Sequence, residues 1–177
     1  MSQPEIVAIL DFETWFSVKQ TSSGAWDCGE DTPDCAGARN MLCARNLTGN
    51  ADYNRWWRFE DCLMSNQSAI PSNAAACATK NNIDKQQLSD CVNGQRGQQL
   101  LALSAQRTAE AKVVWTPWFG CEGLYPAPPP ARPQEIDYLK VICDAYHQAG
   151  GSPMPRACSN STGGAAPHVN SPFQIGV

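Results

Sequence analysis

Nine cysteines are spread over the 177 residues of this chain, and they restrict its fold more than any other feature. No two of them form a Cys-x-x-Cys pair, and the chain has two histidines, His147 and His168. Structural zinc sites usually take closely spaced ligand pairs, so this spacing predicts no metal site. Structural disulfides fit the pattern better. The nine are Cys28, Cys35, Cys43, Cys62, Cys77, Cys91, Cys121, Cys143 and Cys158.

The cysteines and three glycosylation sequons together predict a secretory-pathway protein. The sequons begin at Asn46, Asn66 and Asn160. Because disulfides persist in oxidising compartments, we expect a lysosomal or extracellular location. Residues 1–8 have neither the basic region nor the apolar region of a signal peptide. We therefore expect that the signal peptide is missing from this chain.

Charge and hydropathy disfavour two classes of partner. A formal net charge of −4 and a pI near 5.1 are unsuited to a phosphate backbone, so we expect no nucleic-acid binding. No run reaches the roughly 20 apolar residues of a membrane span.

No motif predicts a bound cofactor. Acidic residues gather between Asp11 and Asp34, but their spacing lacks the EF-hand pattern, and we interpret them as a solvated loop.

The order of the expected elements indicates an α/β fold with a helical insertion. Residues 5–12 (EIVAILDF) predict a buried strand, and residues 113–121 predict a strand that Pro117 interrupts. Helices are expected near residues 56–59, 74–78, 85–92 after an N-cap at Asp84, 97–111 and 135–149, the last ended by Gly150. Loop, extended and disordered segments are expected at residues 20–37, 126–133 and 161–177 respectively.

The helix expected over residues 97–111 has an apolar stripe and a distinctive sequence. Its stripe runs through Leu100, Leu103 and Ala111, with Leu101, Ala105 and Thr108 close beside it. The longer segment 91–111 contains Cys91-x-x-Gly-x-x-Gly97, a Leu-rich stretch and Ala-Gln-Arg-Thr at residues 105–108. A Trp-Thr-Pro-Trp motif follows at residues 115–118, with Glu-Gly in place of Asn-Gly beyond it. These motifs resemble the gamma-interferon-inducible lysosomal thiol reductase family.

A second segment supports that resemblance more loosely. The family's signature is Cys-Gln-His-Gly-x-x-Glu-Cys, followed by Asn and a third cysteine. Cys28, Cys35 and Cys43 reproduce the cysteine spacing without a gap. Gly-Glu-Asp replaces Gln-His-Gly, Asp34 stands for Glu, and Ala38 replaces Asn. The final helix, with its Val-Ile-Cys-Asp-Ala-Tyr stretch, and the last cysteine are also similar, so the resemblance spans about residues 5–160.

The resemblance implies a thiol–disulfide oxidoreductase that lacks its reactive centre. The family is similar to thioredoxin in fold, with a reactive Cys-x-x-Cys between the first strand and the first helix. This chain would begin after that point, so the pair, the first strand and the first helix would be missing. The resemblance assigns a substrate-groove cis-proline to Pro117, with Thr116 supplying adjacent backbone groups.

The resemblance also divides the cysteines into two groups. The eight that match family positions would form four structural disulfides, and Cys121 would remain. An odd cysteine is a reactive thiol, an intermolecular partner or a small buried apolar side chain, and we favour the last. The eight are Cys28, Cys35, Cys43, Cys62, Cys77, Cys91, Cys143 and Cys158.

We therefore expect residues 1–160 to form a single partial thioredoxin-like domain. A cysteine-rich helical subdomain would be inserted at about residues 50–95. An intact version would reduce disulfide-containing polypeptides in the lysosome or secretory pathway, whereas this chain would be inactive. The alternatives are a non-enzymatic secreted relative that binds polypeptides, and an incomplete gene model of an active enzyme.

Overall fold

The computed structural model describes residues 4–7, 9–10, 13–29, 35–49, 53–113 and 137–160. These residues belong to two compact units. The larger unit, here the helical bundle, contains the described residues between 13 and 113. The smaller unit, here the α7 unit, contains residues 4–7, 9–10 and 137–160. Each unit is described by itself.

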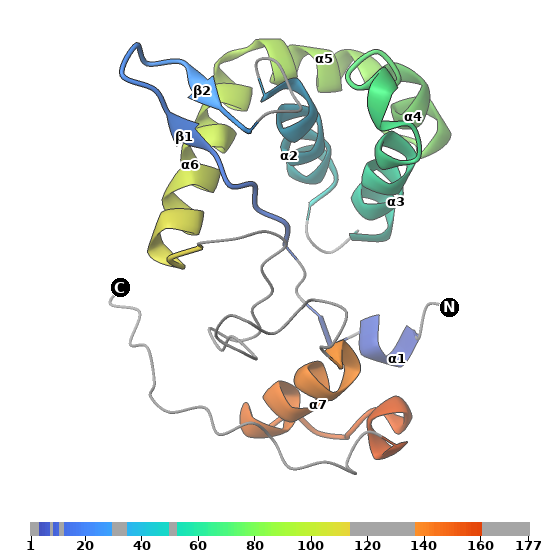
Figure 1. Cartoon of the computed structure of the whole chain (residues 1–177). Coiled ribbons are helices and arrows are strands. Elements are labelled where there is room, and N and C mark those ends of the chain that lie inside the picture. The colour runs from blue at the N-terminus through green and yellow to red at the C-terminus, as the bar shows by residue number, and fades with distance from the viewer. Residues whose placement is uncertain are drawn as a thin grey trace. The chain divides into compact units, whose positions relative to one another are not determined.

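Helix α2 is at the centre of the helical bundle. It packs against α3, α5 and α6, with α6 on one side and α3 on the other (Figure 1). Helix α4 packs against α3 and α5. The helices of the bundle are α2 (Ala36–Thr48), α3 (Tyr53–Met64), α4 (Ala74–Lys80), α5 (Lys85–Asn93) and α6 (Gln95–Glu110), with the short 3₁₀ helix η3 (Gln67–Ala69).

The bundle core forms where α3 turns one face toward α2. Trp56, Phe59 and Leu63 are fully buried, and their spacing of three and four residues places them on one side of the helix. Leu42 of α2 and Leu101 of α6 are also inaccessible to solvent. Burying a large apolar side chain contributes roughly 1.5–3 kcal/mol, so these five form the main apolar support of the bundle.

Helix α6 buries only part of the stripe that the sequence predicts. Leu100 is buried as predicted, whereas Leu103 is 38% exposed, so the prediction is wrong at this residue. The buried residues are Gly97, Leu100, Leu101 and Ser104. A tertiary contact explains the difference, because the Ser104 hydroxyl donates to the Phe16 carbonyl at 3.0 Å. That polar contact fixes which side of the helix is covered.

A short hairpin interrupts the loop expected at residues 20–37. Strands β1 (Lys19–Gln20) and β2 (Trp26–Asp27) pair antiparallel, with Gln20 opposite Trp26. Gly24 closes the turn with a φ of 83°, which glycine adopts without steric cost. Residues 21–25 and 28–29 contain no helix or strand, in agreement with the prediction, whereas Ala36 and Gly37 already belong to α2, so the predicted loop extends too far.

The α7 unit contains α1 (Pro4–Val7), α7 (Tyr138–Gln148) and the 3₁₀ helix η5 (Arg156–Asn160). Its core consists of Ile6, Cys143 and Cys158. The strand predicted for residues 5–12 is therefore wrong where the structure describes it. Glu5 accepts a hydrogen bond from the backbone of Arg156 at 2.7 Å, and Ile6 packs on the disulfide. One helical turn makes these contacts without needing a neighbouring strand.

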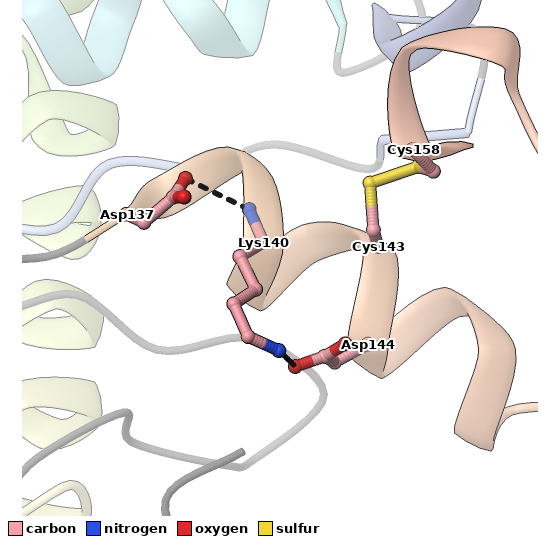
Figure 2. Close-up of polar contacts among 5 residues, drawn as sticks. All are labelled: Asp137, Lys140, Cys143, Asp144 and Cys158. Atoms are coloured by element: carbon pink, nitrogen blue, oxygen red, sulfur yellow. Dashed lines mark hydrogen bonds and ion pairs between the residues drawn. A yellow bond between two sulfur atoms is a disulfide. The ribbon is translucent and has the colours of Figure 1, made fainter. Parts of the chain in front are cut away.

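The predicted end of helix α7 at Gly150 is confirmed, and the structure also shows that Asp137 caps its start. The Asp137 carboxylate caps the helix by accepting from the backbone of Lys140 at 3.0 Å. Gly150 has a φ of 79° and follows the helix, as expected for a C-terminal glycine. Figure 2 shows the cap together with the ion pair between Lys140 and Asp144, which are 2.7 Å apart.

The described residues are mostly helical, with one two-stranded sheet and four disulfides. Helices α3, α4 and α5 lie within the range predicted for the helical insertion. The strand predicted at residues 113–121 lies outside the described residues except for Val113. The extended segment 126–133 and the tail 161–177 also lie outside them. None of the described helices is long and apolar enough to cross a bilayer.

Candidate functional site

Four disulfides use all eight cysteines that the structure describes. The Cα atoms of each pair are 5.4–5.9 Å apart, within the usual range for a disulfide. The prediction of disulfide bonds is confirmed, and four such bonds are consistent with a secreted or extracellular protein. The pairs are Cys28–Cys35, Cys43–Cys91, Cys62–Cys77 and Cys143–Cys158.

The Cys43–Cys91 bond is the most enclosed link within the bundle. It joins α2 to α5, and its two cysteines are 0% and 7% exposed. Thiol–disulfide exchange requires a thiolate to reach one of the sulfur atoms. Burial therefore protects this bond from external thiols and suits it to a structural role.

The Cys28–Cys35 bond is more accessible on one side. Cys28 is half-buried in the loop, whereas Cys35 is fully buried at the N-terminus of α2. Cys35 has a φ of 55°, an uncommon backbone conformation for a residue with a side chain. The bond has a sequence separation of seven, and it links Cys28, which packs against the bundle core, to the N-terminus of α2.

Three residues of the predicted reactive region lie outside the described residues. They are Thr116, Pro117 and Cys121. Their assignments as a cis-proline groove and a free thiol stay predictions. Within the described residues, the prolines that follow cis peptide bonds are Pro71 and Pro153.

A buried carboxyl group that the sequence analysis did not identify lies in the bundle. Glu60 of α3 is 7% exposed, and its carboxylate accepts a hydrogen bond from the Thr14 hydroxyl at 2.9 Å. The Arg45 guanidinium donates to the Thr14 carbonyl, so Thr14 contacts both groups. We call Thr14, Trp15, Arg45, Glu60 and Arg107 the Glu60 cluster.

An aromatic ring lies beside the cationic groups of the Glu60 cluster. The Arg45 guanidinium is 4.1 Å from the centre of the Trp15 ring, and that of Arg107 is 5.9 Å away. Both distances are in the range of cation–π attraction. The Trp15 indole donates to Glu13 at 3.0 Å, which orients the ring. Glu13 itself is exposed.

Burial shifts the pKa values of two members of the cluster, Glu60 and Arg45. Loss of solvent raises the pKa of Glu60 to about 7, although the Thr14 hydrogen bond and the Arg45 charge oppose the change. Loss of solvent also lowers the pKa of Arg45, against the attraction of Glu13 and Glu60. Glu60 can therefore exchange a proton near neutral pH. Its hydrogen bond with Thr14 and the hydrogen bonds between Ser104 and Phe16 together hold residues 14–16 against the helices.

The position of Glu60 along α3 is a signal that would have identified it. It lies four residues after Trp56 and three before Leu63, on the same face as these buried side chains. A carboxyl group on an apolar stripe must be protonated or given partners. Arg45 similarly follows a run of buried residues at the end of α2.

An open groove lies between α2, α4 and α5. Its volume is about 280 Å³, and its lining includes Arg39, Lys85, Asn40, Asn93 and Leu88. Small-molecule sites commonly occupy roughly 300–1,000 Å³, so this groove is at their lower limit. Within the described residues, no group of three or more His, Cys, Asp or Glu side chains is arranged to hold a metal ion.

The three sequons lie at different places in the fold. Asn46 lies within α2 and Asn66 precedes η3, and both side chains are exposed. Asn160 ends η5, but its side chain lies outside the described residues.

The chain was also compared with known proteins. No family model, no curated protein and no solved structure matches it.

Proposed function

We propose that this chain belongs to a thiol–disulfide oxidoreductase of the lysosomal thiol reductase type. Such a protein reduces disulfides of polypeptide substrates in the lysosome or secretory pathway. The proposal includes a thioredoxin-like sheet, with the predicted strand at residues 113–121 and a groove beside Pro117. Its reactive Cys-x-x-Cys is absent from the printed sequence, so the chain by itself is expected to be inactive.

The observation that carries this proposal is the Cys43–Cys91 disulfide. It joins the segment with Cys28, Cys35 and Cys43 to the segment that begins at Cys91, and these two segments carry the resemblance. Helices α2 and α6, which follow Cys35 and Cys91 in these segments, also pack directly against one another. The two segments that carry the resemblance therefore lie together in one part of the fold, and this supports the proposal.

The disulfide pattern supports the division of roles among the cysteines. All eight cysteines at family positions are paired with each other. A reductase needs one thiolate to attack and a second thiol to release the product. Four structural disulfides among these eight are consistent with a redox pair that is separate from them, as the proposal requires.

The raised pKa of Glu60 is compatible with work in an acidic compartment. At pH 5 the carboxyl is largely protonated, because its pKa is about 7. A neutral carboxyl costs less to bury than a carboxylate, so the bundle is favoured by acid conditions. This supports the location included in the proposal.

The test begins with the messenger RNA that encodes this chain. Its reading frame upstream of Met1 is determined, and the full product is assayed for insulin reduction at acidic and neutral pH. We expect the frame to encode a Cys-x-x-Cys and the product to reduce insulin. Replacing both of those cysteines with serine should abolish turnover and leave the four disulfides intact.

The 177-residue chain is the matched control. We expect no insulin reduction from it, and no change on Cys121→Ser. Turnover that depends on Cys121 would contradict the assignment of the reactive pair. An upstream frame without a Cys-x-x-Cys would reject the reductase function for this protein.

The second candidate is a non-enzymatic secreted relative that binds polypeptides. It is favoured by the absence of a Cys-x-x-Cys from the printed sequence together with the oxidation of every described cysteine. The 177-residue chain would then bind a reduced, alkylated polypeptide without any redox change. Titration of such a polypeptide, followed by fluorescence anisotropy, tests this directly. Failure to bind, with an upstream Cys-x-x-Cys present, would exclude it.

A further inference from the structure

The two bundle sequons have the same pattern but present their reactive groups differently. Glycan transfer forms a bond between the asparagine Nδ2 and the C1 atom of a sugar. The C1–O bond to a lipid-linked diphosphate breaks, the diphosphate leaves with the electron pair, and Nδ2 loses one proton. The donor is a lipid diphosphate-linked oligosaccharide of the secretory pathway. The sequon also requires a hydroxyl two residues after the asparagine.

This requirement depends on where the hydroxyl lies. A carboxamide nitrogen is a poor nucleophile, because its lone pair is delocalised into the carbonyl. The need for Ser or Thr at the second position implies that the hydroxyl and the carboxamide are recognised together. A backbone that brings these two groups together is therefore suited to transfer, and one that separates them is not.

Asn66 meets this condition. The Ser68 hydroxyl donates to the Asn66 side-chain oxygen at 3.0 Å, and all three residues of the sequon are exposed. The Asn66 backbone is not helical, with φ −142° and ψ 75°, and the residue directly precedes η3. Its carbonyl accepts from the Asn73 side chain at 3.2 Å, so the turn holds its shape.

A disulfide that flanks the Asn66 sequon also constrains this turn. The Cys62–Cys77 disulfide joins α3 to α4, and the Asn66 sequon lies between its two cysteines. No hydrogen bond from the Asn66 side-chain nitrogen occurs within the described part of the chain. The reacting atom is therefore open to solvent while its backbone is held.

Asn46 does not meet the condition. It lies inside α2, where side chains two residues apart point in different directions. The Thr48 hydroxyl turns back to donate to the Ala44 carbonyl at 3.1 Å. The Asn46 side-chain oxygen accepts from Arg96 Nε at 3.1 Å, and from a second nitrogen of that guanidinium. Both sequon groups are thus engaged separately, and Asn46 links α2 to α6.

We propose that Asn66 carries an N-linked glycan and that Asn46 stays unmodified, serving as a contact between two helices. This inference is independent of redox chemistry. It shares with the proposed function only the passage through the secretory pathway.

The test directs the chain into the secretory pathway. The full chain is produced in animal cells behind a cleavable signal sequence, with Asn160→Gln so that only the two bundle sequons remain. We expect the secreted protein to carry one glycan, which peptide N-glycosidase removes. Enzyme treatment in heavy-oxygen water followed by peptide mass mapping should label residue 66 and leave residue 46 unlabelled.

Matched variants identify the site. Asn66→Gln and Ser68→Ala should each abolish the glycan, whereas Asn46→Gln should leave it unchanged. Free thiols are counted in the same samples to establish that the four disulfides have formed. A glycan on Asn46, or an unmodified Asn66 in a fully oxidised secreted chain, would overturn the inference. Neither result would bear on insulin reduction, so the two proposals fail separately.

Discussion

The helical bundle and the α7 unit differ in how their structure is held together. The bundle has an apolar core that includes Trp56, Phe59 and Leu101, and three disulfides are added to it. The α7 unit has one buried cluster, of Ile6 with the Cys143–Cys158 bond itself. Small units that bury little surface usually depend on such links. Disulfides therefore add to the stability that the apolar core gives the bundle, whereas the α7 unit depends on its disulfide for its core.

The largest expected effect tests the apolar core of the bundle. Phe59 is completely buried, so Phe59→Ala should lower the free energy of unfolding by about 3–5 kcal/mol. Met64, on the same helix, is 47% exposed, and Met64→Ala should change it by less than about 0.5 kcal/mol. Urea denaturation followed by circular dichroism at 222 nm measures both. Equal effects of the two substitutions would show that the core does not carry the bundle.

The next effect compares two disulfides of equal loop length. Cys62–Cys77 lies in the bundle and Cys143–Cys158 in the α7 unit, each with a sequence separation of 15. Removing either pair, by Cys→Ala at both positions, should cost about 3 kcal/mol through the entropy of the unfolded chain. The loss of amide protection within each unit should differ. The bundle keeps its apolar core without Cys62–Cys77, whereas the core of the α7 unit contains the disulfide that is removed.

Hydrogen exchange separates these two results. Without Cys143–Cys158, we expect the amides of α7 to exchange as in an unfolded peptide, while α2 and α6 stay protected. Without Cys62–Cys77, α3 and α4 should lose only part of their protection. An α7 that remains protected without its disulfide would mean that other contacts support the unit.

The third effect is a pH dependence that belongs to the bundle. Glu60 has a folded pKa of about 7 against an ordinary value of 4.5, so the folded state binds more protons between these values. Stability is then greatest below the ordinary pKa and decreases as the pH rises through the folded pKa. The loss between pH 5 and pH 7 should be about 2 kcal/mol.

Glu60→Gln isolates this contribution. Glutamine keeps the shape and an acceptor for the Thr14 hydroxyl but does not titrate in this range. The variant should therefore show a flatter dependence of unfolding free energy on pH from 5 to 7. A variant that loses stability with pH as steeply as the parent would assign the dependence to other groups.

Local structure was predictable from the sequence where neighbouring residues decide it. Asp84 caps α5 by accepting from the backbones of Gln86 and Gln87, as its place before a helical segment predicted. Gly150 follows α7 for the same kind of reason. These signals act within one turn, so the remainder of the chain cannot change them much.

Features that depend on distant residues were not predictable. The β-branched residues 5–12 favour a strand, but Ile6 finds its partner in a disulfide far along the chain and forms a helical turn. Eight cysteines allow 105 pairings, and only the fold selects one. The Glu60 cluster joins residues 14, 45 and 60, whose meeting no local pattern indicates.

The smallest effect compares one helix cap from each unit. Asp84 accepts two backbone hydrogen bonds at the start of α5, whereas Asp137 accepts one at the start of α7. Replacing either by alanine should cost about 1 kcal/mol, with Asp84→Ala the larger. In the bundle, α5 should stay folded after this loss, because the apolar core holds it in place. The α7 unit has no such reserve, so Asp137→Ala should increase amide exchange along all of α7. An increase restricted to its first turn would show that contacts other than the cap hold the rest of the helix.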